Sequence, residues 1–274
     1  MIALSTGSLF TYGTARVARL AAAAGFDGLE IMIDDRWDTR DAAYLAEVAR
    51  AAGIPILSLH APFRPGMDGW GGDEVVRVAR TVDLARALDA RVVVAHPPVR
   101  YQWLSIRYPP FINVSALTPF RRRSRYRRWM TMELAAFGTR AGITIAIENM
   151  PRHRLGTRMI NLFDLNEIRD LRELPALTFD TTHLGTWGVD LLDTYQALAD
   201  RVVHVHLSNY DGRQHRLPQD GRLALGPFLG ALRSRGFGGI IVVELDPESS
   251  GAGDDRRVQD RLAAAAAFCR EHFA

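Results

Sequence analysis

The segment ITIAIEN at residues 143–149 decides the fold, because its residues alternate with a period of two. In a β-strand, residues two positions apart point to the same side. The three isoleucines therefore share one face, and Thr144, Ala146 and Glu148 share the other. A bulky apolar face has to meet covering helices, so the face that ends on Glu148 is expected to point into the interior of a sheet structure closed on itself.

Seven further β-branched runs surround this segment, and amphipathic helical patterns separate them. The eight predicted strands cover residues 2–6, 28–33, 54–60, 91–96, 143–149, 176–180, 201–208 and 239–245. Three of the helical patterns run into Gly25, Gly53 and Gly142, and glycine is the residue expected to stop a helix there. Strands joined by crossover helices form a parallel sheet, and eight such units predict an α/β fold, a (β/α)₈ (TIM) barrel.

The competing architecture is a doubly wound open sheet. No glycine-rich dinucleotide turn follows the first strand, and eight regular units favour the closed barrel. Barrels of this length stay undivided, so a single domain is predicted over residues 1–274. The longest departure from regular spacing is residues 97–122 after the fourth strand, predicted as a long loop over the active-site face. Its aromatic residues, among them Trp103, would stack on a substrate ring, or pack over the barrel mouth or against a second subunit.

Composition restricts the class of protein. Hydrophobic residues make up 47% of the 274 residues and charged residues 24%, which is typical of a soluble globular protein with a large core. No apolar run approaches the roughly 20 residues needed to cross a bilayer, and the first ten residues lack the pattern of a secretory signal. Cys269 is the single cysteine, so no internal disulfide can form. These features predict a cytoplasmic protein without a membrane partner.

Lysine is absent: all 34 basic residues are arginine. Schiff-base chemistry and pyridoxal-phosphate attachment both need a lysine amine, because a guanidinium stays protonated and is a poor nucleophile. A phosphate-binding loop of the GKS or GKT type is excluded for the same reason.

Ionisable residues gather at the carboxyl ends of the predicted strands, the end of a barrel where active sites are assembled. They are Glu30, His60, His96, Glu148, Asp180, His206 and Glu244. Several carboxylates aimed into one cavity repel each other, and a bound cation is the natural solution. Carboxylates with an imidazole suit Mn²⁺, Mg²⁺ or Co²⁺, and Zn²⁺ becomes possible if more histidines join.

Six motifs at strand ends carry a resemblance to a known family. They are LHAPF at 59–63, AHPP at 95–98, IENM at 147–150, FDTTH at 179–183, HVHLSN at 204–209 and VVELDP at 242–247. In this order they make the chain resemble the xylose isomerase-like barrels. That superfamily contains sugar isomerases and epimerases as well as the apurinic-site endonucleases, and the resemblance covers essentially the whole chain.

The resemblance to the ketose epimerases implies one divalent metal, Mn²⁺ before the others, on Glu148, Asp180, His206 and Glu244. It implies a carbohydrate-like substrate whose enediolate the metal stabilises, with the two glutamates as acid and base on opposite sides. His183 would hydrogen-bond a substrate oxygen. An isomerase needs the same parts, and an inosose-type dehydratase would begin with the same proton abstraction. Relatives of this kind are often homodimers or homotetramers.

The endonuclease branch is the alternative, a phosphodiester hydrolase with additional metal ligands that match His60 and His96 and an Asp-x-His pair. His215 matches the histidine of that pair, but Arg213 stands where the pattern has aspartate, and a guanidinium cannot ligate a metal. Arg213 instead suits a substrate anion. The run RRRSRYRR at 121–128 is more typical of a solvated helix face than of a nucleic-acid surface, so nucleic acid is not the expected partner.

Other interpretations remain open for single residues. His60 and His96 either contact a substrate hydroxyl, which we favour, or belong to a dinuclear metal site. Glu30 either contacts substrate or is a buried acid bonded to a neighbouring strand. His204 is expected to be a hydrogen-bonded histidine in the barrel interior. A barrel that binds a ligand without catalysis is a third class of function, which a complete metal site makes less favourable.

Overall fold

The chain forms a closed parallel barrel whose strands follow the order β1-β12-β11-β10-β7-β4-β3-β2. The computed structural model describes residues 1–62, 67, 69–108, 112–121 and 124–273, with residues 102–121 described by their backbone alone. The barrel strands are β1 (Ile2–Ser5), β2 (Gly28–Met32), β3 (Ile56–His60), β4 (Val92–Ala95), β7 (Thr144–Glu148), β10 (Leu177–Asp180), β11 (Val202–Leu207) and β12 (Ile240–Val243). Each lies inside the run predicted for it, so the (β/α)₈ barrel is confirmed.

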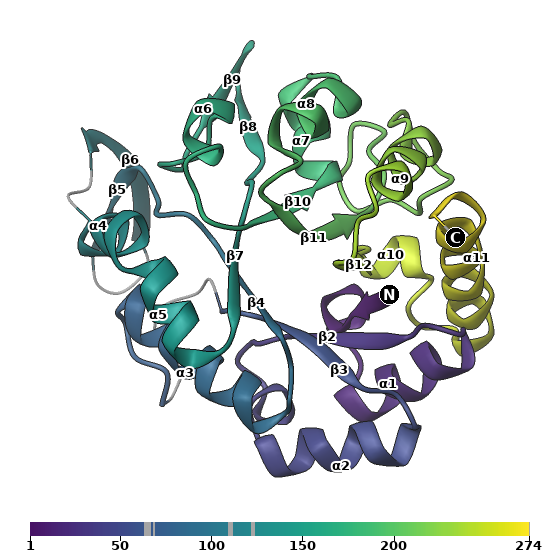
Figure 1. The fold of residues 1–274 in the computed structure, drawn as a ribbon. Helices are drawn as coiled ribbons and strands as arrows, with labels where there is room; N and C mark the ends of the chain where they lie inside the picture. The colour runs from purple at the N-terminus through teal and green to yellow at the C-terminus, as the bar shows by residue number, and fades with distance from the viewer. Residues whose placement is uncertain (63–66, 68, 109–111, 122–123, 274) are drawn as a thin grey trace.

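Helices surround the barrel as an outer ring (Figure 1). They are α1 (Thr14–Ala23), α2 (Ala42–Ala52), α3 (Glu74–Ala87), α4 (Arg125–Met132), α5 (Leu134–Ala141), α6 (Ile168–Leu171), α7 (Thr181–Trp187), α8 (Leu191–Leu198), α9 (Leu225–Ser234), α10 (Pro247–Ser250) and α11 (Asp255–Phe273), with short 3₁₀ turns at Thr6–Leu9 and Trp37–Thr39. The helix α11 packs against α1 and α9 and closes the ring beside β1. Among the described residues, no helix combines the length and the apolar character that a membrane crossing requires.

Local sequence signals position the helix ends. Asp41 and Asp73 cap the first turns of α2 and α3, because their carboxylates accept hydrogen bonds from backbone N–H groups of those turns. At the other end, Gly53 and Gly142 adopt the left-handed conformation that glycine reaches without steric cost, with φ of 66° and 69°. These are two of the predicted helix stops, and Gly25 also has a positive φ of 84°.

The two faces of each barrel strand pack into different apolar layers. Ala146 belongs to a small cluster inside the barrel, which also contains Ala3, Val92, Ala176, Ile240 and Val242. Its neighbours Ile145 and Ile147 belong to the large outer core between the strands and the helices. The alternation predicted for residues 143–149 is therefore confirmed, and Glu148 lies on the inward face.

Two hairpins extend from the carboxyl ends of barrel strands. The segment predicted as a long loop, residues 97–122, contains the antiparallel strands β5 (Tyr101–Tyr108) and β6 (Ile112–Arg121), because its aromatic and β-branched residues favour extended backbone. The side chain of Trp103, a predicted substrate contact, lies outside the described residues. A second hairpin, β8 (Arg152–Leu155) with β9 (Arg158–Asn161), follows β7 and was not predicted.

Candidate metal centre

A cavity of about 450 Å³ opens at the carboxyl ends of the barrel strands. Predicted site residues line it together with apolar side chains: His60, His96, Glu148, His183, His215 and Glu244, with Met32, Tyr126, Met150 and Phe163 among the others. Cavities of this size hold small molecules, and a few polar groups in an apolar wall fix the orientation of a ligand.

Four predicted ligands converge beside this cavity: Glu148 and Glu244 line it, and Asp180 and His206 are fully buried next to them. Glu148 and Asp180 are the last residues of β7 and β10, His206 lies near the end of β11, and Glu244 follows β12 directly. Each offers one ligand atom, and these four atoms all lie within 4.8 Å of one another. Nδ1 of His206 is 2.9 Å from Oε1 of Glu148 and 3.0 Å from Oε2 of Glu244, and it is 3.8 Å from Oδ2 of Asp180. The structure therefore brings together the complete predicted set.

The electrostatics of this set are unbalanced. Burial raises the pKa of Asp180, and the charges of Glu148 and Glu244 raise it further, to well above its ordinary value. Burial opposes ionisation of the two glutamates too, but the charge and hydrogen bonds of His206 outweigh it. The pKa of Glu148 is held well below its ordinary value and the pKa of Glu244 is lowered to about 2. Asp180 is thus the acid that lacks compensation.

Asp180 also provides the test of whether a cation fits. Its Oδ1 accepts the backbone N–H of His183 at 2.7 Å, which caps α7. Its Oδ2 is buried and has no hydrogen-bond partner among the described residues. A buried carboxylate oxygen without a partner is costly, and a cation would relieve that cost. Three carboxylates and one imidazole form a mostly hard donor set that suits Mn²⁺, Mg²⁺ or Co²⁺.

His60 and His96 form a second donor set with the other oxygen of Glu148. Oε2 of Glu148 lies 2.9 Å from Nε2 of His96 and 3.4 Å from Nε2 of His60, and the two ring nitrogens are 3.1 Å apart. Nδ1 of His60 is 3.0 Å from the carbonyl oxygen of Ala61, so the ring donates there and leaves Nε2 as an acceptor or ligand. This group could hold a second cation that shares Glu148, or it could share one imidazole proton and meet a substrate hydroxyl.

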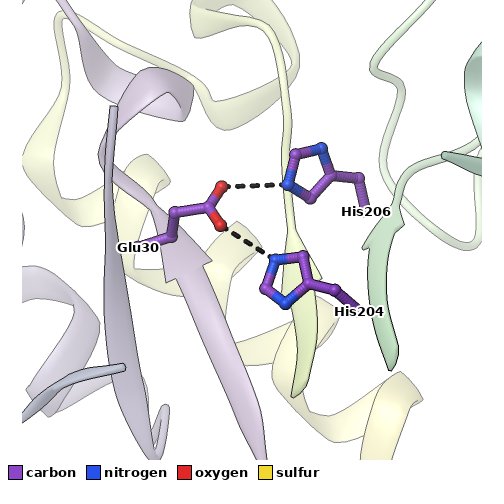
Figure 2. A group of neighbouring side chains, drawn as sticks. All are labelled: Glu30, His204 and His206. Atoms are coloured by element: carbon purple, nitrogen blue, oxygen red, sulfur yellow. Dashed lines mark hydrogen bonds and ion pairs between the residues drawn. The ribbon is translucent and has the colours of Figure 1, made fainter. Parts of the chain in front are cut away.

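Glu30 lies beneath the cavity, fully buried and outside the described lining. Figure 2 shows its carboxylate between the rings of His204 and His206. Oε1 of Glu30 is 3.0 Å from Nε2 of His206, and Oε2 is 2.9 Å from Nε2 of His204. The hydroxyl of Ser58 donates to Oε2 at 2.8 Å. Of the two interpretations of Glu30, the geometry agrees with the buried acid bonded to a neighbouring strand, because Ser58 is on β3. The two histidines are on β11, across the barrel interior, and His204 lies in that interior as expected.

Comparison with known proteins places the chain in a family. Residues 18–271 match the model of the xylose isomerase-like TIM barrel family. The chain belongs to this family.

Several known proteins resemble the chain over nearly its whole length. An uncharacterized protein of Mycobacterium tuberculosis is 25% identical, over 99% of this chain and 97% of that protein. The crystal structure of 3-keto-D-glucoside 4-epimerase from E. coli has a TM-score of 0.66 at 17% identity and covers 97% of this chain and 98% of that one. An AP endonuclease, family 2, from Brucella melitensis has a TM-score of 0.67 at 19% identity, with the same coverage of 97% and 98%. At these identities the solved structures establish a shared fold.

His183, in the first turn of α7, and His215, in the loop between β11 and α9, both line the cavity. Nδ1 of His183 is 2.8 Å from the carbonyl oxygen of Asn149, so Nδ1 donates and Nε2 is left as an acceptor. Burial lowers the pKa of His183 to about 4, which keeps the ring neutral at pH 7. Nδ1 of His215 lies 3.3 Å from the carbonyl oxygen of Glu244, and its backbone adopts a φ of 57°. Both residues face the predicted site.

Arg213 is placed differently from the other predicted substrate contacts. Its side chain is 59% exposed, and its guanidinium is 3.4 Å from the carboxylate of Glu248 on α10. The described lining of the cavity does not include it. Asp211, the nearest upstream acid, accepts the backbone N–H of Arg213 and faces Arg216 at 3.4 Å. Among the described residues, neither His183 nor His215 belongs to a group of three or more side chains that could hold a metal ion; the remaining group of that kind is Glu30, His204 and His206.

Asn149 is a site residue that the sequence reasoning did not single out. Its side-chain amide donates to the carbonyl oxygen of Asp180 at 3.0 Å, and its Oδ1 accepts the backbone N–H of Asp180 at 2.8 Å. These two hydrogen bonds join the carboxyl ends of β7 and β10, where Glu148 and Asp180 lie. The feature of the sequence that could have identified Asn149 is its position directly after Glu148 in the IENM motif.

Proposed function

We propose that the chain is a divalent-metal-dependent sugar or polyol isomerase or epimerase that works through an enediolate. The observation that supports this most is the pairing of Glu148 and Glu244 around Nδ1 of His206, at 2.9 and 3.0 Å, next to the unpartnered oxygen of Asp180. The fold is shared with an E. coli sugar epimerase, which is consistent with the proposal.

Glu148, Asp180, His206 and Glu244 would hold the cation, with Mn²⁺ proposed first. When bound, a divalent cation polarises adjacent substrate oxygens and stabilises the negative charge of the enediolate. The family resemblance and the cavity's few polar groups favour a substrate with neighbouring hydroxyl and carbonyl groups.

The two glutamates supply the proton transfers. Both have a lowered pKa, so both are carboxylates at neutral pH and either can take the proton next to the carbonyl. They reach the cavity from β7 and from the end of β12, which are separated in the barrel by β10 and β11. A carbon is inverted when one glutamate takes the proton and the other, first protonated from solvent, returns a proton from the opposite side, whereas return at the adjacent carbon converts an aldose into a ketose. The first glutamate then releases its proton to solvent.

The histidines would orient the substrate. Nε2 of His183 is an acceptor because Nδ1 donates to the carbonyl of Asn149, so this ring fits a substrate hydroxyl. The Nε2 atoms of His60 and His96 lie 3.4 and 2.9 Å from Oε2 of Glu148, and both rings line the same cavity. They restrict the rotation of that carboxylate, which keeps the proposed base directed at the substrate.

The test is proton exchange. We expect the Mn²⁺-loaded chain, incubated in D₂O with a panel of ketoses, aldoses, their phosphates and inososes, to incorporate deuterium at carbon in at least one substrate. EDTA should abolish the exchange, and Mn²⁺ or Co²⁺ should restore it. Glu148→Gln and Glu244→Gln should each remove exchange, whereas Glu47→Gln, at an exposed glutamate paired with Arg50, should not. Loss of water from the product would identify a dehydratase, and no exchange with any sugar would contradict the proposal.

The donor set of His60, His96 and Glu148 favours phosphodiester hydrolysis as a second candidate, because a second cation beside the first is the arrangement that clamps a phosphate. The Brucella AP endonuclease, family 2, shares the fold. This candidate predicts incision of a duplex that contains an abasic site, and loss of that incision in Glu148→Gln. The metal content of the purified chain separates the two: one ion per chain favours the sugar reaction, and two or three favour the hydrolase.

A further inference from the structure

Glu30 is completely buried, accepts hydrogen bonds from Ser58 and His204, and makes an ion-pair contact with His206. Of these three neighbours, only His206 faces the candidate metal centre. Its two oxygens have different surroundings. Oε2 accepts hydrogen bonds from Oγ of Ser58 at 2.8 Å and from Nε2 of His204 at 2.9 Å. Oε1 instead lies 3.0 Å from Nε2 of His206 (Figure 2). A carboxylate has no proton to give, so Nε2 of each ring has to carry the hydrogen.

This contact decides which nitrogen of His206 faces Glu30 and which faces the other proposed ligands. With the hydrogen on Nε2 toward Glu30, the opposite nitrogen Nδ1 is directed at Glu148 and Glu244. The two carboxylates lie 2.9 and 3.0 Å from Nδ1, so without a cation Nδ1 carries a hydrogen toward them, and a cation bound there would take the place of that hydrogen. The contact with Glu30 thus orients the ring for coordination through Nδ1.

We propose that Glu30 is the positioning residue of the metal centre: it holds His206 with Nε2 protonated and Nδ1 toward the cation, while Ser58 and His204 hold Glu30. The inference rests on the proposed function only in that His206 is a metal ligand. Glu30 has no contact with the cavity, so it acts through His206. Carboxylates behind metal-binding imidazoles commonly change metal affinity about 10- to 100-fold when they are removed.

Glu30→Gln is the decisive variant because the two shapes are nearly the same. A glutamine offers one oxygen and one NH₂ group. The oxygen is expected on the side of Ser58 and His204, where two donors converge, and the NH₂ group then faces Nε2 of His206. That ring must then place its hydrogen on Nδ1, the nitrogen that the cation needs.

We expect Glu30→Gln to raise the dissociation constant for Mn²⁺, measured by titration calorimetry of the folded apoprotein, by about 10- to 100-fold. Thr178→Val is the matched control: Thr178 is also fully buried on β10, and its hydroxyl has no hydrogen-bond partner among the described residues. Its affinity for Mn²⁺ should stay within about twofold of that of the unchanged chain. If Glu30→Gln is less stable yet binds Mn²⁺ as tightly as the unchanged chain, Glu30 is a structural acid only and the inference is overturned.

A spectroscopic measurement on the unchanged chain tests the same inference and does not depend on whether a variant folds. In the chain labelled with ¹⁵N-histidine and loaded with ¹¹³Cd²⁺, His206 should show its hydrogen on Nε2, in slow exchange, and its cadmium coupling on Nδ1. Coupling on Nε2, or a hydrogen on Nδ1, would overturn the inference. If the unchanged chain binds neither Mn²⁺ nor Cd²⁺, the proposed function fails. If it binds them and Glu30→Gln does the same with equal affinity, only the role of Glu30 fails.

Discussion

The two ends of the barrel interior are built from the same strands but from opposite kinds of residue. Toward the amino ends, the inward positions are apolar and form the cluster that includes Ala146, Ile240 and Val242. Two residues further along β7 and just past β12, the same inward face carries Glu148 and Glu244. One end therefore stabilises the barrel through packing, whereas the other concentrates charge that is costly without a cation.

This difference indicates that the carboxyl end contains groups that lower the stability of the folded chain but are suited to a chemical function. Buried ionisable groups at the carboxyl end constrain one another through hydrogen bonds, yet Asp180 retains an oxygen without a partner among the described residues. Proteins commonly keep such destabilised groups where function needs them. Substitutions at the two ends should therefore change different quantities, cation affinity at one and the free energy of unfolding at the other.

The largest effect is expected for Glu148→Gln. Glu148 contributes to both donor sets, so we expect the dissociation constant for Mn²⁺ to rise more than about 100-fold, or about 2.8 kcal/mol of binding free energy. Titration calorimetry measures this, with Glu47→Gln as the control at an exposed glutamate. Unchanged affinity would mean that the carboxyl end is not a metal centre.

Asp180→Asn should raise the free energy of unfolding of the apoprotein although it alters a proposed metal ligand. The raised pKa of Asp180 means that its ionised form destabilises the folded apoprotein at pH above the ordinary value of 3.8. An asparagine still caps α7 through its Oδ1, so we expect the apoprotein to gain about 1 to 2 kcal/mol at pH 7 in urea unfolding. The gain should shrink as the pH falls toward 3.8, because Asp180 then becomes neutral in the folded and the unfolded chain alike. A loss of stability at pH 7 would refute this view of the carboxyl end.

Ile240→Val tests the role of the apolar cluster at the amino end of the barrel interior. Ile240 is buried in the interior apolar cluster, so removal of one methylene group should lower the free energy of unfolding by about 1 kcal/mol. The affinity for Mn²⁺ should stay within about twofold of the unchanged value. A change in affinity as large as that of Glu148→Gln would show that the two ends are not independent.

The smallest effect is expected for Arg213→Ala, which belongs to neither end. The ion pair of Arg213 with Glu248 is exposed at both partners, so urea unfolding should change by no more than about 0.5 kcal/mol. If Arg213 contacts substrate during turnover, as its sequence position suggested, KM should rise while stability stays constant. A substantial loss of stability would assign Arg213 a structural role that its exposure does not suggest.

Much of the fold and of the site could be predicted because both follow from short-range patterns. The period of two in residues 143–149 placed Glu148 on the inward face, and the turn residues placed the helix ends. The long segment 97–122 was less predictable, since pairing of β5 with β6 depends on contacts between two strands. Asn149 was missed because its two bonds reach Asp180, which is distant in the sequence.

The sequence by itself determined the eight strands, their inward faces and the chemical kinds of residue at the carboxyl end. Those properties depend on the local geometry of a strand, which repeats every two residues. Only the tertiary structure decided that Glu30 lies beneath the cavity and that Nδ1 of His206 faces the other acids. The choice between two ring nitrogens depends on which partner the folded barrel brings to each. Glu30 reaches His206 only because the barrel closes and directs side chains of β2 and β11, which are separated by β1 and β12, into one interior.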